Sequence, residues 1–285
     1  MKKSFLSLFL FFVLSSQAQS SMIIVDYQGD TVVRQKNVER NLIINSDDDG
    51  VYDIAVRPME SELVSSDGNV RIPLENVYIN NTREDVYLRY NEYSNLFKDL
   101  TMGGVAKNMT AKIRDYGMVP AGVYNLNFEI QATDSETQEI ASMSTFNLQF
   151  IVPVIQDINL NGEMPRITAG ASDAFDPQKR IVNEVSPSIQ INSNSDWELA
   201  VNCDSLGETK GNYYIRTVTA TSNVFERLQE RVLLEPGKEI ILAKGKAPAD
   251  NESVTVEFSI SSVDGKYISA GNYENRVRYI LREVR

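Results

Sequence analysis

The chain lacks histidine altogether, and it contains a single cysteine among 285 residues. Without histidine it has no Ser-His-Asp or Cys-His catalytic group, none of the usual zinc sites and no imidazole to act as a general base. It also has no glycine-rich phosphate loop. Paired carboxylates of a glycosidase remain open in principle, but no pattern selects two that converge. We therefore predict a protein that is not an enzyme and that holds no cofactor and no metal.

The lone cysteine, Cys203, excludes an intramolecular disulfide, so packing must stabilise the fold. Because it follows apolar Val201 in an alternating segment, we interpret it as a small buried apolar side chain, with intermolecular pairing as the alternative. The formal net charge of −11 is unfavourable for contact with nucleic acid or an anionic membrane.

Residues 1–18 are typical of a signal peptide. Two lysines at positions 2 and 3 precede an apolar run over 5–14, and small residues follow at 16–18, which predicts cleavage after Ala18. The alternative, a membrane anchor, is less suitable because the run is about ten residues long whereas a span needs about 20. No later segment is apolar enough to span a bilayer. We expect an exported protein of the periplasm or cell surface, in a bacterial envelope.

The chain contains an internal repeat. Residues 42–46 (Leu-Ile-Ile-Asn-Ser) precede 52–56 (Tyr-Asp-Ile-Ala-Val), and residues 189–193 (Ile-Gln-Ile-Asn-Ser) precede 197–201 (Trp-Glu-Leu-Ala-Val). The same phrases in the same order indicate two copies of one module. Pro153 interrupts the chain between them. We predict domains over residues 19–153 and 154–285.

Apolar and polar residues alternate within each copy. Tyr124, Leu126, Phe128 and Ile130 fall on one face of a strand whose other face is polar. Short strands of this kind between turns predict an all-β fold of two tandem immunoglobulin-like antiparallel β-sandwich domains. Segments 92–100 and 224–234 are the two helix candidates, and both also fit loop or strand, so we expect little helix.

Two side-chain clusters invite a binding role. The acidic turn 47–50 (Asp-Asp-Asp-Gly) has the oxygen ligands that calcium prefers, but its spacing does not fit an EF-hand loop and a polar hairpin turn is the simpler interpretation. Tyr87, Tyr90 and Tyr93 form a candidate aromatic surface for a sugar or a protein. The alternative for these tyrosines is strand packing, because tyrosine is a favoured strand residue.

The turns Ala121-Gly122-Val123-Tyr124 and Ala270-Gly271-Asn272-Tyr273, each leading into an alternating strand, resemble the closing strands of secreted bacterial pilin-like domains. Spore coat protein U and related fimbrial subunits end in a similar way, although these families often carry cysteines. The resemblance implies assembly by strand addition, in which an extended segment of one subunit completes the sheet of another.

A candidate partner-binding strand lies within residues 22–33, where Ile23, Val25 and Tyr27 share one face. The alternative is that this segment is the first strand of its own domain. The sequence thus predicts a surface or fimbria-like structural subunit or adhesin, which contacts other protein subunits or a surface ligand. The alternative functions are a periplasmic chaperone-like protein, since pilus chaperones also have tandem immunoglobulin-like domains, and a carbohydrate- or protein-binding protein.

Overall fold

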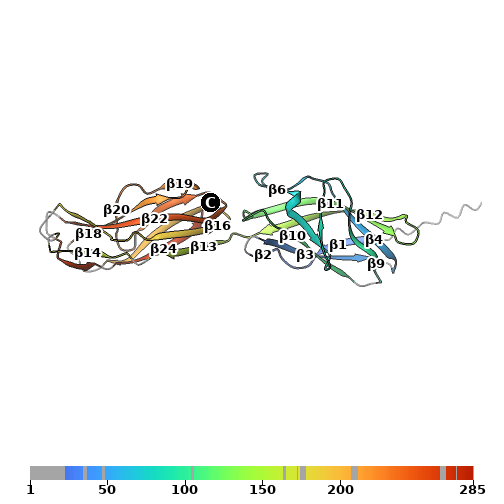
Figure 1. Cartoon of the computed structure of the whole chain (residues 1–285), viewed down its shortest axis with the longest axis horizontal. Coiled ribbons are helices and arrows are strands. Elements are labelled where there is room, and N and C mark those ends of the chain that lie inside the picture. Colours follow the sequence, from blue (N-terminus) through green and yellow to red (C-terminus); the bar gives the residue numbers. More distant parts are fainter. Residues whose placement is uncertain are drawn as a thin grey trace, which may run out of the picture.

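The computed structural model describes residues 23–34, 37–46, 49–103, 106–162, 165–171, 173, 178–206, 211–263, 268–273 and 275–284. The predicted signal peptide and residues 47–48 of the acidic turn lie outside the described residues. Figure 1 shows two bodies of β-structure arranged end to end along the long axis. Each is a sandwich whose strand ladders are antiparallel, which confirms the predicted all-β fold of two tandem immunoglobulin-like β-sandwiches.

Two six-stranded sheets form the first sandwich. The first sheet has the order β1-β3-β10-β7-β8, with β2 also paired to β3, and the second has the order β6-β5-β11-β4-β9, with β12 also paired to β11. The bounds in the first sheet are β1 Ile23–Tyr27, β2 Val32–Arg34, β3 Asn37–Ser46, β7 Val77–Asn80, β8 Asp85–Tyr87 and β10 Lys107–Ile113. Those in the second are β4 Val51–Pro58, β5 Glu62–Ser65, β6 Arg71–Pro73, β9 Ser94–Thr101, β11 Gly122–Asp134 and β12 Ile140–Val152.

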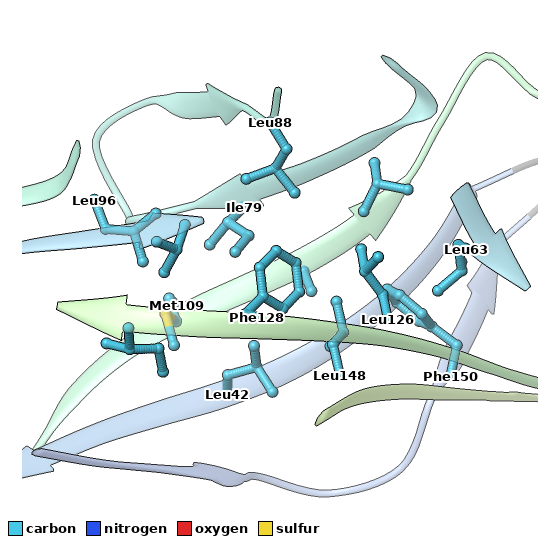
Figure 2. Close-up of a cluster of buried hydrophobic side chains, with 14 of the residues drawn as sticks. Leu42, Leu63, Ile79, Leu88, Leu96, Met109, Leu126, Phe128, Leu148 and Phe150 are labelled. Atoms are coloured by element: carbon cyan, nitrogen blue, oxygen red, sulfur yellow. The ribbon is translucent and has the colours of Figure 1, made fainter. Parts of the chain in front are cut away.

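The core of the first sandwich follows from the period-two alternation of its strands. Leu126 and Phe128 of β11 are buried, whereas Asn127 between them is exposed. Figure 2 shows these apolar side chains meeting Leu42 and others from the facing sheet. Burial of each such side chain contributes on the order of 1.5–3 kcal/mol, so the alternation determines which face of each strand turns inward.

Three sheets form the second sandwich: β13-β16-β22-β18-β20 with β15 paired to β22, then β14-β23, then β19-β21-β17-β24. The bounds in the first of these are β13 Gln156–Asn161, β15 Arg180–Val182, β16 Ser188–Ser193, β18 Gly211–Ala220, β20 Val232–Leu233 and β22 Ala249–Ser262. The remaining strands are β14 Ile167–Ala169, β17 Trp197–Leu206, β19 Val224–Arg227, β21 Glu239–Gly245, β23 Gly271–Tyr273 and β24 Asn275–Glu283. A second core cluster contains Trp197 and Cys203, both fully buried.

Neither helix candidate is helical. Segment 92–100 contributes to β9, and segment 224–234 contributes β19 and β20. The helical element in the described part of the chain is one short 3-10 turn, η1 Leu74–Asn76. No helix in those ranges is long and apolar enough to cross a membrane.

The repeated sequence phrases occupy equivalent places in the two sandwiches. In the first, β3 pairs with β1 so that Ser46 lies opposite Ile23; in the second, β16 pairs with β13 so that Ser193 lies opposite Gln156. Likewise, β4 pairs with β11 in the first sandwich, and β17 pairs with β24 in the second. Each repeated aromatic packs over a glycine, Tyr52 over Gly50 just before its own strand and Trp197 over Gly245 of the neighbouring β21, and a Cβ at either glycine would overlap the ring.

Asn194, in the turn between β16 and β17, ties the two sandwiches together. Its side-chain Nδ2 donates to the carbonyls of Pro153 at 2.9 Å and Val119 at 3.3 Å, and its Oδ1 accepts from the N–H of Ile155 at 2.7 Å. Its carbonyl also accepts from the N–H of Ala121 at 2.7 Å. The predicted boundary at 153/154 lies between the two core clusters and stays a prediction.

Candidate protein-interaction site

The predicted partner-binding strand is β1, the edge strand of the first sheet. Ile23 is buried, and Val25 and Tyr27 pack partly buried against the first core. The Tyr27 hydroxyl donates to the carbonyl of Asn147 at 2.5 Å and accepts from the N–H of Gln149 at 2.6 Å. Burial raises the pKa of Tyr27, which keeps this hydroxyl protonated. The strand thus lies within its own domain here, and its donation to another subunit stays a prediction.

Strand β12 closes the side of the first sandwich. It pairs with β11 from Gly122 to Thr133. Its own outer edge is covered by side chains, since the N–H of Ile151 donates to the Thr31 hydroxyl at 2.9 Å and Tyr27 bonds Asn147 and Gln149. An edge whose backbone groups are satisfied in this way is a poor template for another strand.

Strand β24 of the second sandwich occupies the place of β11, and among the described residues it pairs with β17 and lacks the second partner that β11 has in β12. Strand β24 pairs with β17 as β11 pairs with β4. By this register, Val277, Tyr279 and Leu281 are equivalent to Phe128, Ile130 and Ala132. Among the described residues, β17 is the sole strand that pairs with β24, whereas β14 pairs with the preceding β23. Phe128, Ile130 and Ala132 are buried, but their equivalents in β24 are only partly buried.

The backbone of β24 presents hydrogen-bonding groups on this uncovered side. The N–H of Val284 donates to the carbonyl of Asp196, at the end of the β17–β24 ladder. Because bonded and non-bonded pairs alternate along an antiparallel ladder, Val277, Tyr279 and Leu281 direct their N–H and C=O groups away from β17. Within the described ranges no backbone partner meets them. We call these three residues the β24 edge.

Strand β13 flanks the β24 edge from the other sheet. Leu160 of β13 lies opposite Ile189, as Tyr27 of β1 lies opposite Leu42, so Leu160 and Tyr27 hold equivalent positions. Tyr27 contacts β12, whereas Leu160 is 60% exposed and no strand among the described residues takes the place of β12 beside it. We call the strip formed by Leu160 and the β24 edge the seam of the second sandwich.

Three arginines line the outward face of β24. Arg276 and Arg278 are exposed, and Arg278 pairs with Asp204 at 3.1 Å. Arg282 bonds Glu198 and pairs with Glu239 at 2.8 Å, and the Glu198 hydrogen bond is the main cause that raises the pKa of Arg282. Arg276 has no ionic partner among the described residues, so the strand carries positive charge in an acidic protein.

The candidate aromatic surface lies on the connection between β8 and β9. Tyr87 and Tyr90 are 67% and 57% exposed, and the Tyr87 ring meets Tyr78 edge-on at 5.0 Å. Tyr93 is held more firmly, because its hydroxyl bonds Glu129 and Arg57 lies 5.0 Å from its ring centroid. Desolvation raises the pKa of Tyr93. Two largely exposed rings, at the end of β8 and in the connection that follows it, fit the predicted contact surface, which stays a prediction.

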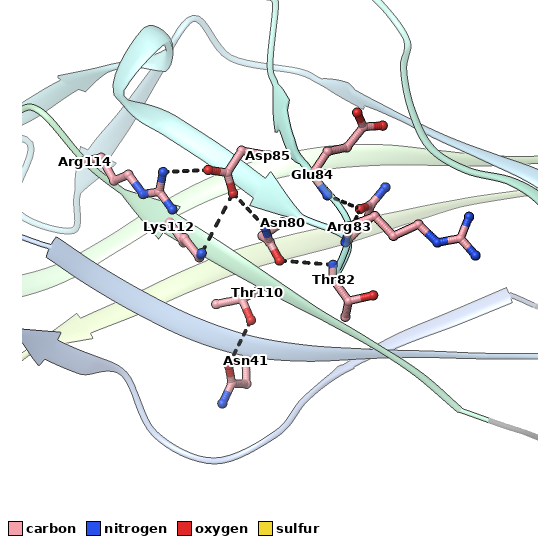
Figure 3. A network of polar contacts seen from close by, with 10 residues as sticks. Asn41, Asn80, Thr82, Arg83, Glu84, Asp85, Thr110, Lys112 and Arg114 are labelled. Atoms are coloured by element: carbon pink, nitrogen blue, oxygen red, sulfur yellow. Dashed lines mark hydrogen bonds and ion pairs between the residues drawn. The ribbon is translucent and has the colours of Figure 1, made fainter.

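The side chains of a polar network on the first sheet bond to one another (Figure 3). Asp85 accepts from Asn80 at 2.8 Å and from Arg114 at 2.5 Å, and Lys112 lies 3.8 Å away. The Asn80 hydrogen bond is the main cause that lowers the pKa of Asp85, with help from Arg114 and Lys112. In the described ranges no three His, Cys, Asp or Glu side chains gather as metal ligands.

Sequence reasoning missed the seam. The alternation of Arg276 and Arg278 with Val277 and Tyr279 was visible as a half-buried strand. Which neighbour covers that strand depends on how the strands pair, and the alternation carries no information about that.

No family model matches the chain, and no curated protein sequence matches it. Among solved structures, the C-terminal domain of the Streptococcus agalactiae antigen I/II polypeptide BspA is 8% identical, over 92% of this chain and 96% of that chain, with a TM-score of 0.23. The C-terminal domain of the Streptococcus pyogenes antigen I/II-family protein AspA is 9% identical over the same shares, with a TM-score of 0.25. TM-scores this low assign neither a family nor a function to the chain.

Proposed function

We propose that the protein is an exported, non-enzymatic surface component, a structural subunit or adhesin, that acts through protein–protein contacts. The β24 edge carries the proposal. A strand with unpaired N–H and C=O groups is a template for another strand, and natural proteins cover or block such edges unless they use them. The first sandwich covers the equivalent edge with β12, whereas in the part of the chain that the structure describes β24 pairs with β17 alone.

The composition of the chain supports a protein partner. A net charge of −11 disfavours nucleic acid, and the basic N-terminus followed by an apolar run supports export. The ionic clusters of the described residues, such as that of Asp85 with Arg114 and Lys112, are mutually satisfied pairs. Such pairs stabilise a fold, and the proposal needs no catalytic role for them.

A second candidate function is the binding of a carbohydrate or protein ligand by the exposed tyrosines. Tyr87 and Tyr90 present rings to solvent, and amphipathic rings of this kind are favoured in contact surfaces. This function requires no strand addition. Substitution of both residues by serine therefore separates the two candidates, because it removes the rings and leaves the β24 edge intact.

Site-specific photocrosslinking in the producing cells tests the proposal. A crosslinking residue replaces Arg278 beside the β24 edge, and a matched control replaces Lys112 on the first sandwich. We expect the mature chain to be accessible to protease on intact cells. We also expect a crosslink from position 278, but not from position 112, to an envelope protein that mass spectrometry identifies. A chain found in the cytoplasm, or equal crosslinking from both positions, would overturn the proposal.

A further inference from the structure

We infer that a cleft in the first sandwich binds a saccharide that carries a carboxylate, that is, a uronic acid. The cleft has a volume of about 480 Å³ and lies between the turn 81–84, strand β9 and the beginning of β10. Clefts of this size accept small ligands. The site is separate from the β24 edge and adds a second binding activity to the proposed function. We call it the β9 cleft.

Buried Asn81 fixes the wall of the β9 cleft that the turn 81–84 forms. Its side-chain Nδ2 donates to the carbonyl of Leu96 in β9 at 2.5 Å. Its Oδ1 accepts from the N–H groups of Arg83 and Glu84 at 3.0 Å each. One side chain thus ties the turn to the strand that forms the other wall. A site that is held in place before its ligand arrives binds at a lower entropic cost.

A β-bulge in β9 determines which side chains the second wall presents. Opposite Asp53 of β4, β9 carries two residues, Lys98 and Asp99, in place of one. Asp99 has a left-handed φ of +50°, and its N–H donates to the Asp53 carboxylate at 2.8 Å. Regular alternation turns neighbouring side chains to opposite faces, whereas both of these residues line the cleft. The bulge therefore directs a cation and a carboxylate into one site.

Three cations line the β9 cleft, namely Arg83, Lys98 and Lys107. None of them takes part in an ion pair among the described residues, whereas other cations of this sandwich do: Arg57, Arg71, Arg89, Lys112 and Arg114. Figure 3 shows the Arg83 side chain pointing away from the network around Asp85. Lys107 is half-buried on the same face of β10 as buried Met109, and partial burial strengthens the attraction of a charge. Unpaired cations gathered in a chain of net charge −11 indicate a ligand with a negative group.

The other polar groups of the β9 cleft suit hydroxyl groups. Glu84 and Asp99 supply carboxylates, which accept from hydroxyls, and Asn95 and Asn108 supply amides, which both donate and accept. Phe97 adds a half-buried ring that suits the apolar C–H face of a sugar. A saccharide combines hydroxyls with such a face.

The mixture of charges decides between classes of ligand. A bare phosphate or sulfate ion would meet the carboxylates of Glu84 and Asp99 at close range, and a neutral sugar would leave the three cations unpaired. A uronic acid places its carboxylate against the cations and its hydroxyls against the two carboxylates. Arg83 suits this role because a planar guanidinium bonds a carboxylate through two N–H groups.

Calorimetric titration of the mature chain, residues 19–285, tests the inference. The probes are the disaccharides of galacturonic acid and of glucuronic acid. Their methyl esters are the matched controls, because they keep the rings and remove the charge. We expect at least one acid to bind about tenfold more tightly than its ester at low salt, which corresponds to a few exposed ion pairs. Added salt should reduce the difference, because these pairs are screened.

Substitution of the cations locates the binding. Arg83→Gln with Lys107→Gln should remove the preference for the acid over the ester. Arg71→Gln with Lys238→Gln is the matched control, since both side chains are exposed and lie outside the β9 cleft, and it should leave the preference unchanged. Hydrogen exchange in segments 81–84 and 95–100 should slow when the acid binds. Circular dichroism verifies that each variant is folded.

Equal binding of acids and esters, no binding of either disaccharide, or a preference that survives the Arg83 and Lys107 substitutions would overturn the inference. Tighter binding of an aspartate tetrapeptide than of either acid would overturn the choice of a saccharide. Loss of binding in the Tyr87→Ser, Tyr90→Ser variant would assign the sugar to the exposed tyrosines, which lie outside the cleft. Crosslinks from position 278 in cells do not involve the β9 cleft, so each of these results leaves the proposed function standing.

Discussion

Tyr27 and Leu160 hold the same register position in the two sandwiches, yet Tyr27 bonds the backbone of a neighbouring strand and Leu160 is exposed to solvent. The difference arises from β12, which lies beside β1 and β3 and has no counterpart beside β13 among the described residues. The first module is thus closed at its side by β12, and the described part of the second module has no strand at the equivalent place.

Removal of the Tyr27 hydroxyl should loosen the closed side. Tyr27→Phe deprives the N–H of Gln149 of its acceptor, so we expect the free energy of unfolding of the first sandwich to fall by about 1 kcal/mol. Hydrogen exchange at the Gln149 amide should accelerate. Denaturant unfolding followed by circular dichroism and exchange mass spectrometry measure both effects. Tyr87→Phe is the control, because the Tyr87 side chain is exposed and its hydroxyl has no bond to a strand among the described residues. An equal effect of Tyr87→Phe would contradict the role of Tyr27.

The glycine beneath the single tryptophan should be intolerant of a side chain. Gly245→Ala brings a methyl group into the Trp197 ring, and overpacking of a core costs about 1–3 kcal/mol. Because Trp197 is the sole tryptophan, its fluorescence reports the unfolding of the second sandwich. Gly50→Ala causes the matching overlap with Tyr52 in the first sandwich. We expect Gly245→Ala to shift the fluorescence midpoint more than Gly50→Ala does, and the reverse order would refute this assignment.

The junction between the sandwiches should depend on Asn194. Asn194→Ala removes the hydrogen bonds to the carbonyl of Pro153 and the N–H of Ile155, at a cost of about 1 kcal/mol for each bond. Small-angle X-ray scattering should then show a wider distribution of distances between the two bodies. The control is Asn159→Ala on the exposed face of β13. Unchanged scattering of the Asn194 variant would show that other contacts hold the junction.

Acid should weaken the polar network of Asp85. Asn80, Arg114 and Lys112 lower the pKa of this carboxyl in the folded chain, so its contribution is present above its ordinary pKa near 4 and is lost as pH falls through the lower folded pKa. Asp85→Asn should therefore reduce the free energy of unfolding by about 1 kcal/mol at neutral pH, and the difference from the native chain should vanish in stronger acid. Denaturant titrations across this range measure it, with exposed Asp30→Asn as the control. A difference that is constant with pH would contradict the assignment.

The sequence by itself determined the local structure of this protein and its duplication. Period-two alternation such as Tyr124, Leu126 and Phe128 identifies strands and their buried faces, because the side-chain direction of a strand depends only on the backbone. The repeated phrases around Tyr52 and Trp197 identified two equivalent modules, and the lone Cys203 was expected in the core, where it lies.

The tertiary structure alone decided which edges are closed. Tyr27 bonds the backbone of β12, and Asn194 bonds the other sandwich, and each of these contacts joins residues far apart in the sequence. Such contacts depend on how the chain places its strands in three dimensions, and no local period encodes them. The same alternation therefore occurs at Phe128, whose strand also pairs with β12, and at Val277, whose strand pairs with β17 alone among the described residues.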